Sequence, residues 1–268
     1  MYKAVFIDID GTLIKSDHSI SQVTIDTIKK VKQKGIHVVL VSARPLHGII
    51  NISKQIGLDD VPIASLNGSY IALKDEILYN CTIDPSILED LYSSLKKYKV
   101  SIIYYQQMKW FAEVENKYTI NEQKITEIPI IIKPFNELLG TWKEDAVGPN
   151  KLLVIGEDLE IAKIQKEIKP QYQDALNMYT SKPIYLEVMD HAASKTCAVK
   201  FFMERFQIKR EEVIAIGDNF NDIEMIQFAG LGIAMGNAPQ EVKSVADFVT
   251  VSNNEDGVAK GLEKFLIK

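Results

Sequence analysis

The chain begins with short, wholly apolar runs separated by amphipathic stretches. The first run, residues 4–7 (AVFI), is too short for an amphipathic helix and is typical of a strand buried on both faces of a parallel sheet. A helix is expected next, because apolar residues recur at helical spacing between Ser21, which suits an N-cap, and Gly35, which suits a helix end. The pattern therefore predicts a strand followed by a helical crossover.

The same alternation continues along the chain. Residues 36–41 (IHVVLV) predict a second buried strand, and the helix after it is expected to begin near Pro45. Residues 61–66 predict a third strand, which leads into the turn dipeptide Asn67-Gly68. Strand, helix, strand, helix, strand in this order indicates a parallel sheet covered by helices.

The middle of the chain has a different pattern. Asp84 and Pro85 can start a helix, and residues 100–105 and 109–114 predict a β-hairpin where another crossover would be expected. The stretch 118–150 predicts no clear elements. Beyond it the expected elements are a strand at 152–155, a helix at 158–168, and strands near 178 and at 185–189. We therefore predict a second domain inserted into the first.

After residue 189 the first pattern returns. Ser194 can cap a helix, and apolar runs predict strands at 213–216, 231–235 and 248–251 before a closing amphipathic helix. The predicted fold class is α/β, with a doubly wound, Rossmann-like parallel sheet as the core and an inserted α+β domain. The predicted boundaries give the core residues 1–83 and 190–268 and the insertion residues 84–189.

Composition narrows the functional classes. With 268 residues, 46% hydrophobic and 25% charged, the chain is typical of a soluble globular protein. The net charge of -5 without a basic block argues against nucleic-acid partners, and no apolar stretch approaches membrane-spanning length. Cys81 and Cys197 lack metal-site or redox spacing, and no signal-peptide core is present, so we expect a cytoplasmic location. A small polar substrate fits best, and the sequence carries no signal for an oligomeric state.

Polar side chains follow three of the predicted buried strands. They are Asp8 and Asp10 after the first, Ser42 after the second, and Asp218, Asn221 and Asp222 after the strand at 213–216. Ligands of an open parallel sheet bind beyond the carboxyl ends of its strands, so four or five carboxylates are expected to converge there, with Asp8 and Asp10 on the same side. Two like charges about 4 Å apart cost about 4 kcal/mol near a protein surface, so this cluster requires a cation. All-oxygen ligation suits Mg²⁺, which also contacts substrate phosphate.

The arrangement of these motifs resembles the haloacid dehalogenase superfamily. The matching residues are Asp8-Ile9-Asp10-Gly11-Thr12, Ser42 after a strand, Lys195 at a helix start, and Gly217-Asp218 followed by Asn221-Asp222. The insertion between the second and third motifs, together with Asn67-Gly68, resembles the Cof-type (IIB) sugar-phosphatase branch. The resemblance spans nearly the whole chain, with one departure: Thr196 stands where the family often has glycine.

The resemblance implies a Mg²⁺-dependent phosphohydrolase of small phosphorylated metabolites, with sugar phosphates as the expected substrates. Asp8 would be the nucleophile that forms an aspartyl-phosphate, and Asp10 would protonate the leaving oxygen and then deprotonate water. The metal would be held by Asp8, the backbone carbonyl of Asp10, and Asp218. Asp222 would orient Lys195 or a metal-bound water. The phosphoryl oxygens would be bound by the Ile9 and Ala43 amides, Ser42, Lys195 and Asn221.

Several of these residues have simpler explanations. Ser42 alone could be a helix cap, and a solitary lysine such as Lys195 is usually solvated. Arg44 either assists phosphate binding or lies exposed. Asn67 belongs to a turn first and is a substrate contact second, and His191 is either a substrate contact or a surface residue of the linker.

Two other functions stay open on the sequence alone. A phosphomutase or another phosphoryl transferase would use the same motifs with a different acceptor, and release of free phosphate in water would favour the hydrolase. A non-catalytic phosphate-binding or phospho-accepting module also places an aspartate at a strand end. Such a module needs neither an inserted domain nor an acid two residues after the acceptor, and a stable aspartyl-phosphate would favour it.

Overall fold

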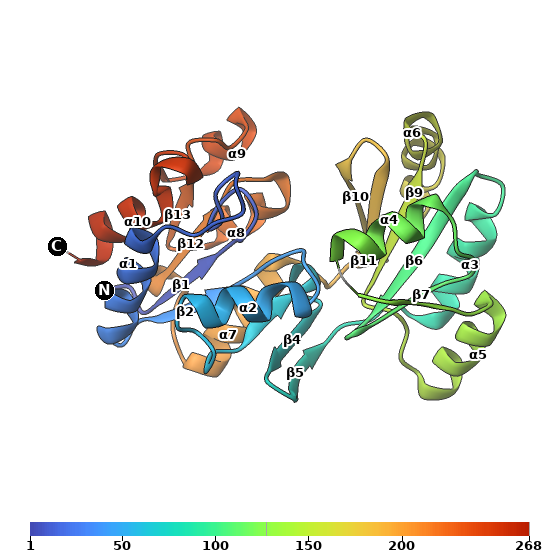
Figure 1. Ribbon diagram of the computed structural model, residues 1–268, viewed down its shortest axis with the longest axis horizontal. Coiled ribbons are helices and arrows are strands. Elements are labelled where there is room, and N and C mark those ends of the chain that lie inside the picture. Colours follow the sequence, from blue (N-terminus) through green and yellow to red (C-terminus); the bar gives the residue numbers. More distant parts are fainter. Residues whose placement is uncertain (127, 268) are drawn as a thin grey trace. The chain divides into compact units, whose positions relative to one another are not determined.

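The structure is a computed structural model that describes residues 1–126 and 128–267, and it divides into two compact units (Figure 1). Unit 1 comprises Met1–Leu78 and the chain from Ser194 onward, and unit 2 comprises Tyr79–Ala193. Glu127 and Lys268, which belong to the predicted insertion and to the predicted second core segment, lie outside the described residues. The domain boundaries after residues 83 and 189 stay a prediction.

Unit 1 is built on a five-stranded sheet with the order β14-β13-β12-β1-β2, and all of its neighbouring strands are parallel. The strands are β1 (Ala4–Ile7), β2 (His37–Leu40), β12 (Val213–Gly217), β13 (Leu231–Ala234) and β14 (Phe248–Val249). Every residue of β1 and β12 is buried, as expected for central strands with helices on both faces. The predicted α/β class with a Rossmann-like parallel sheet is confirmed.

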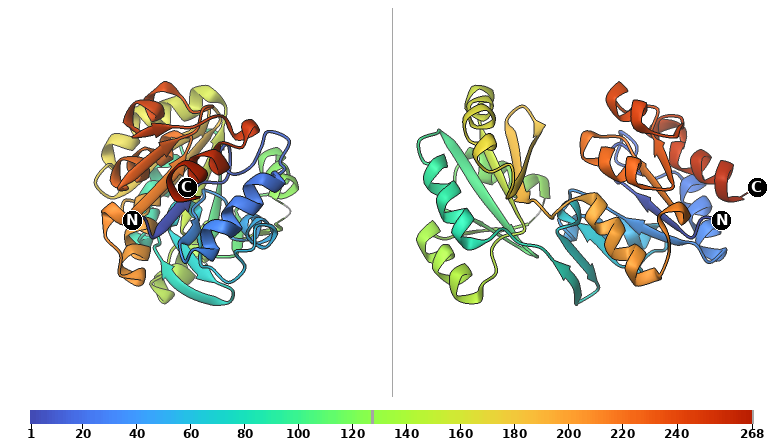
Figure 2. Two further views of the ribbon diagram at one scale, coloured as in Figure 1. Left: turned by 90° about the vertical axis from the view of Figure 1, so that its left-hand side faces the viewer. Right: turned by 180° about the vertical axis from the view of Figure 1, so that it is seen from behind.

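The helices of unit 1 flank this sheet (Figures 1 and 2). They are α1 (Gln22–Gln33), α2 (His47–Gln55), α7 (Lys195–Phe206), α8 (Ile223–Phe228), α9 (Gln240–Val245) and α10 (Gly257–Leu262). The predicted caps are confirmed: the Ser21 hydroxyl accepts the Thr24 amide, and the Ser194 hydroxyl accepts the Cys197 amide. The second cap fixes the start of α7. In the described part of the chain, no helix is both long and apolar enough to cross a bilayer.

The predicted third strand is present as β3 (Ile63–Ser65), and it lies parallel to the end of β2. An isolated parallel bridge joins Val41 to Ala64, and the Ser42 amide donates to the Ala64 carbonyl at 2.9 Å. β3 also pairs antiparallel with β4 (Tyr70–Leu73), and β5 (Glu76–Asn80) completes this three-stranded sheet. The predicted parallel direction is therefore confirmed, and the antiparallel partner was not predicted.

The turn at residues 66–68 explains this reversal. Leu66, Asn67 and Gly68 have φ of 49°, 55° and 84°, so the chain folds back within three residues and no helical crossover follows. A Cβ atom on Gly68 would clash with the carbonyl oxygen of Ser194, the residue that caps α7. The turn thus requires glycine at this position and lies against the start of α7.

Unit 2 holds a six-stranded sheet with the order β10-β11-β9-β6-β7-β8. Its strands are β6 (Val100–Gln106), β7 (Lys109–Ala112), β8 (Ile130–Ile132), β9 (Lys151–Gly156), β10 (Leu176–Lys182) and β11 (Tyr185–Asp190). Its helices are α3 (Pro85–Leu95), α4 (Lys117–Thr126), α5 (Phe135–Asp145) and α6 (Asp158–Glu167). The predicted helix after Asp84 and the predicted hairpin are confirmed, whereas α4, β8 and α5 occupy the stretch for which the sequence predicted no elements.

The two faces of the unit 2 sheet differ in character. Alternate residues of its strands, such as Tyr104, Leu152 and Val188, form one apolar core with α3, α5 and α6. Lys151 and Glu187 point to the other face, where α4 contacts β6. Unit 2 therefore has an independent core and a separate buried polar cluster.

Candidate active site

Three neighbouring strands of unit 1 end at the same edge of the parallel sheet. Ile7 at the end of β1 is paired with Ile216 of β12 on one side and Leu40 of β2 on the other. The Asp8 amide still donates to the Ile216 carbonyl at 3.0 Å, so Asp8 is placed one residue beyond the last position of β1. The polar residues that follow these strands therefore meet in space, as the sequence indicated.

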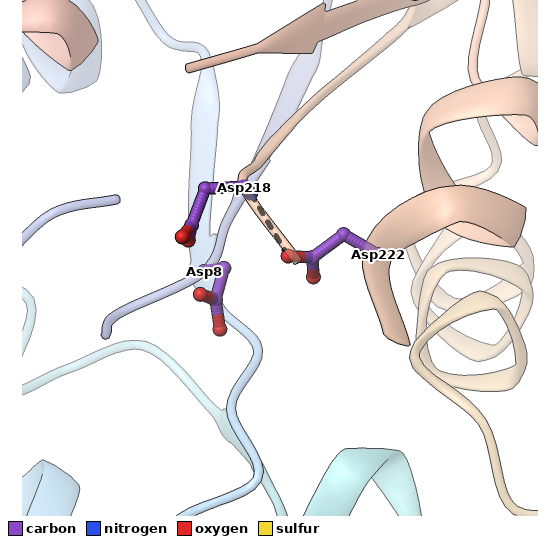
Figure 3. A group of neighbouring side chains, drawn as sticks. All are labelled: Asp8, Asp218 and Asp222. Carbon is purple, nitrogen blue, oxygen red and sulfur yellow. Dashed lines mark hydrogen bonds between the residues drawn. The ribbon is translucent and has the colours of Figure 1, made fainter. Parts of the chain in front are cut away.

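A cluster of three acids lies at this edge: Asp8, Asp218 and Asp222 (Figure 3). Each offers a carboxylate oxygen, and the three oxygens lie within 4.8 Å of one another. Asp8 is 5% exposed and Asp222 is fully buried. A fourth acid lies near these three, as expected: the Asp10 carboxylate binds Arg44, and its negative charge also acts to raise the pKa of Asp218.

Lys195 stands among these acids at the first position of α7. Its Nζ donates to Oδ1 of Asp8 at 2.6 Å and to Oδ1 of Asp222 at 2.5 Å, and its side chain is 1% exposed. The alternative of a solvated surface lysine is therefore wrong. Burial alone would lower the pKa of Lys195, but attraction by Asp222 and Asp8 outweighs it and holds the pKa above its ordinary value.

Both oxygens of Asp222 are occupied within the protein. Oδ1 accepts Lys195, and Oδ2 accepts the backbone amides of Asp218 and Asn219 at 3.0 and 2.9 Å (Figure 3). Gly217 allows this approach, because a Cβ atom there would lie 2.5 Å from the Asp222 side chain. Asp222 thus orients Lys195 and the turn that carries Asp218.

Asp218 is held by residues from two other loops. The Thr12 hydroxyl donates to Oδ1 at 2.7 Å, and the Asn237 amide group lies 3.4 Å from Oδ2. Asn237 also donates to the Gly11 carbonyl at 2.8 Å, and a Cβ atom on Gly11 would clash with the Asp218 carboxylate. Sequence reasoning missed Asn237, although it follows another buried strand, β13, and that position was an available signal.

Burial makes the acids of this cluster reluctant to ionise. It raises the pKa of Asp8 well above its ordinary value, although Lys195 acts in the opposite direction. It raises the pKa of Asp218 to about 6, while the hydrogen bond from Thr12 works to lower it. Three carboxylates and one ammonium leave two formal negative charges uncompensated, which is the charge of one divalent cation.

A divalent cation fits these side chains. The available donors are carboxylate oxygens, which suit a hard cation, and the glycine at position 11 lets the Asp218 carboxylate lie close against the chain. Among the described residues, Oδ2 of Asp8 accepts no hydrogen bond, so Asp8 and Asp218 have ligand capacity that Asp222 lacks.

Asp10 and Asp8 face different cations. The strand ends at Ile7, and Gly11 with φ of 78° turns the chain after Asp10. That the two acids lie on the same side stays a prediction. The Asp10 carboxylate accepts two hydrogen bonds from Arg44, from Nε at 2.7 Å and from Nη2 at 2.6 Å. Arg44 is therefore an ion-pair partner of Asp10 and only partly exposed, and its assistance to phosphate binding stays a prediction.

The predicted phosphate-binding residues surround the ends of the same strands. Ser42 is 1% exposed, and its carbonyl accepts the Asn67 amide at 2.8 Å. The Asn67 side-chain oxygen accepts Asn221 Nδ2 at 2.9 Å, so the turn at residues 66–68 links the second and fourth motifs. Ala43 follows Ser42 in the same loop, and Ile9 lies fully buried beside Asp8.

His191 is the one candidate that lies outside this unit. It belongs to unit 2, where its side chain is exposed and its amide donates to the Ala175 carbonyl at 2.9 Å. The structure therefore offers no argument for a chemical role of its side chain.

Fold and site together define a class of protein: an α/β enzyme with a buried aspartate, a buried lysine and an oxygen-only cation site at the carboxyl edge of a parallel sheet. Comparisons with known proteins agree. A family model described as haloacid dehalogenase-like hydrolase matches residues 5–262. A "Putative phosphatase" from Haemophilus influenzae is 39% identical and covers 98% of this chain and 98% of its own length. The chain belongs to the haloacid dehalogenase-like hydrolases.

Further relatives support the same assignment. The "5-amino-6-(5-phospho-D-ribitylamino)uracil phosphatase YcsE" of Bacillus subtilis is 30% identical, with 99% of this chain and 96% of that protein covered. The crystal structure of a haloacid dehalogenase-like hydrolase from Bacteroides thetaiotaomicron has a TM-score of 0.85 at 30% identity, with 99% and 100% covered. The protein is a phosphatase, and the resemblance to the Cof-type branch of the haloacid dehalogenase superfamily is confirmed.

Proposed function

We propose that this phosphatase hydrolyses small phosphorylated metabolites, sugar phosphates among them, through an aspartyl-phosphate on Asp8. The observation that carries the proposal is the state of Asp8: it is buried at a strand end, Lys195 holds one of its oxygens, and among the described residues the other oxygen accepts no hydrogen bond. A carboxylate held in this way has one oxygen aimed for attack and a cation that offsets the approach of an anionic phosphate.

The proposed hydrolysis has two chemical steps. In the first, an Asp8 oxygen forms a bond to phosphorus, the bond from phosphorus to the leaving oxygen breaks, and Asp10 gives that oxygen a proton. In the second, Asp10 takes a proton from water, the water oxygen bonds to phosphorus, and the bond between phosphorus and Asp8 breaks. Free phosphate results, and both aspartates return to their starting states.

The other residues bind the phosphoryl group or orient those that do. Lys195 and Ser42, both almost fully buried, would donate to phosphoryl oxygens, together with the Ile9 and Ala43 amides. Asn221 would do the same, and its bond to Asn67 fixes its side chain. Asp222 keeps Lys195 aimed at Asp8.

Mg²⁺ is the cation we propose, held by Asp8, the backbone carbonyl of Asp10, and Asp218. When bound, it would neutralise charge on the acids and on the phosphate. The all-oxygen donor set and the two uncompensated charges of the cluster support this choice.

The substrate class rests on the relatives. The name of the Bacillus subtilis phosphatase given above states a substrate whose phosphate is carried by a ribityl chain. We extend this class of small phosphorylated polyol to the present chain. A cytoplasmic location and a cap formed by residues 84–189 complete the proposal.

The test is the Asp8→Asn variant. With Mg²⁺ and p-nitrophenyl phosphate, we expect turnover to fall at least about 10⁴-fold, because the amide cannot form the intermediate. The thermal midpoint should not fall, since the substitution removes one charge from an overcharged cluster. Retained turnover in the variant would refute Asp8 as the nucleophile. Phosphate transferred to an added sugar, or a phosphorylated wild-type protein stable for hours, would refute simple hydrolysis.

A further inference from the structure

The pair between Arg44 and Asp10 is the part of the site that the proposed steps do not yet explain. Arg44 lies in the loop between β2 and α2, and its guanidinium uses two donors on the two oxygens of Asp10. A third donor, Nη1, lies 3.4 Å from the Gly48 carbonyl. The Arg44 side chain is 30% exposed and the Asp10 side chain 56% exposed.

The backbone of Arg44 fastens this guanidinium to the phosphate-binding loop. The Arg44 amide donates to the Ser42 hydroxyl at 3.1 Å, and the Arg44 carbonyl accepts the Leu66 amide at 2.9 Å. Leu66 begins the turn whose next residue, Asn67, holds Asn221. The guanidinium is thus carried by a segment that is itself tied to two of the proposed phosphate-binding residues.

We propose that Arg44 is a positioning residue that holds the Asp10 carboxylate in the orientation from which it deprotonates the hydrolytic water. This inference rests on the proposed function and adds a residue to it. Without Arg44, a half-exposed aspartate is able to sample several rotamers, whereas a two-point ion pair leaves it one. A displacement of about 1 Å in a catalytic group costs about 10²-fold in rate, so this restraint has a measurable value.

The pair leaves Asp10 able to act. A carboxylate has about four lone-pair positions, and the guanidinium uses two of them. The remaining positions and the exposed edge of Asp10 are open to water. The proton passes from that water to an Asp10 oxygen as the water oxygen bonds to phosphorus, and Arg44 itself neither gains nor loses a proton.

The competing explanation is that Arg44 binds the substrate phosphate directly. The geometry speaks against it, because the two donors that make the planar fork are already used on Asp10 and a third faces Gly48. A phosphate could bind the fork only by displacing the carboxylate. The two explanations predict different kinetic changes.

The experiment compares Arg44→Ala with the wild type on p-nitrophenyl phosphate and Mg²⁺. We expect kcat to fall about 10-fold to 100-fold while the inhibition constant of inorganic phosphate stays within about twofold. Stopped-flow traces should show a burst of p-nitrophenolate approaching one per site, because hydrolysis of the intermediate becomes limiting. Arg44→Lys should recover part of the rate, since an ammonium restores the charge without the fork. Arg205→Ala, an exposed arginine at the end of α7, is the matched control.

A double-mutant cycle gives the decisive measurement. If Arg44 acts only through Asp10, then Arg44→Ala should cost nothing further in the Asp10→Asn background. An unchanged kcat in both Arg44 variants, a tenfold rise in the phosphate inhibition constant, or full additivity with Asp10→Asn would each overturn the inference. Wild-type turnover that depends on Asp8 but not on Arg44 leaves the proposed function intact. A wild type that releases no phosphate from any ester sinks the proposed function itself.

Discussion

Each unit of the protein buries a cluster of charges, and the two clusters differ in their balance. In unit 2, Lys151 and Glu187 lie 3.2 Å apart with side-chain exposures of 6% and 9%, so their charges offset each other, and a further buried carboxylate, Glu122, accepts the Tyr185 hydroxyl. In unit 1, three carboxylates share one lysine. The excess negative charge of the cluster in unit 1 destabilises the fold unless something offsets it. We therefore expect a cation and a substrate to bind at this cluster.

The two clusters also lie at different places relative to their strands. Lys151 and Glu187 lie on the neighbouring strands β9 and β11, and Glu122 of the covering helix α4 accepts the Tyr185 hydroxyl. The acids of unit 1 lie beyond the ends of their strands, and Asp218 is only partly buried. The cluster of unit 2 is enclosed within that unit, whereas the cluster of unit 1 is accessible to solvent at Asp218.

Removing Lys195 should have the largest effect on this comparison. In Lys195→Met the acids lose the buried ammonium that binds Asp8 and Asp222, so we expect turnover to fall at least about 10³-fold and the free energy of unfolding to fall by about 3–5 kcal/mol. Denaturant unfolding and turnover of p-nitrophenyl phosphate measure both. Lys200→Met, on the exposed side of the same helix, is the control and should change stability by about 0.5 kcal/mol or less. A Lys195→Met protein that is as stable and as active as the wild type would show that the acids of unit 1 do not need a buried cation.

Breaking the balanced pair should affect stability alone. Lys151→Met leaves Glu187 buried without its cation, so the free energy of unfolding should fall by about 3–5 kcal/mol. The double variant Lys151→Met with Glu187→Leu should recover part of that loss, because the uncompensated charge of Glu187 is removed. Urea unfolding of the three proteins tests this, with turnover per folded molecule expected within threefold of the wild type. If the double variant is as unstable as the single one, the uncompensated charge of Glu187 is not the cause of the loss.

The unbalanced cluster should also give metal-free protein an unusual pH dependence. Burial raises the pKa of Asp218 to about 6 from its ordinary value of 3.8, so the folded state binds more protons than the unfolded state between these two values. Stability should therefore fall as pH rises from about 4 to 6, by up to about 3 kcal/mol. Thermal unfolding in EDTA measures this slope, and Asp218→Asn should flatten it. A metal-free protein whose stability rises with pH over this range would contradict the assignment.

Much of the fold could be predicted because its signals are local. The buried run of β1, the Ser21 and Ser194 caps and the hairpin of β6 and β7 each depend on a few adjacent residues. The antiparallel pairing of β3 with β4 was not predicted, because it is decided by the positive φ of the turn between the two strands. The strand itself is as apolar as its parallel neighbours.

The candidate site could be predicted as a group of residues but not as a set of contacts. Strand ends of a parallel sheet converge whatever their side chains do, so Asp8, Ser42 and Asp218 could be assigned to one edge. The partner of Asp10 depends on a turn at Gly11 and on the reach of Arg44, which sequence spacing does not encode. Asn237 was missed for the same reason, since its contact with Gly11 joins loops that are distant in sequence.

The glycine at position 68 has a consequence for how the enzyme can vary. A single hydrogen atom there leaves room for the Ser194 carbonyl, and the next residue after Ser194 is the lysine that grips Asp8. Any larger substituent would push on the first turn of α7 and so displace an ammonium that two carboxylates hold in place. Substitution of Gly68 is therefore restricted by the ion pairs of Lys195, a residue far away in the sequence.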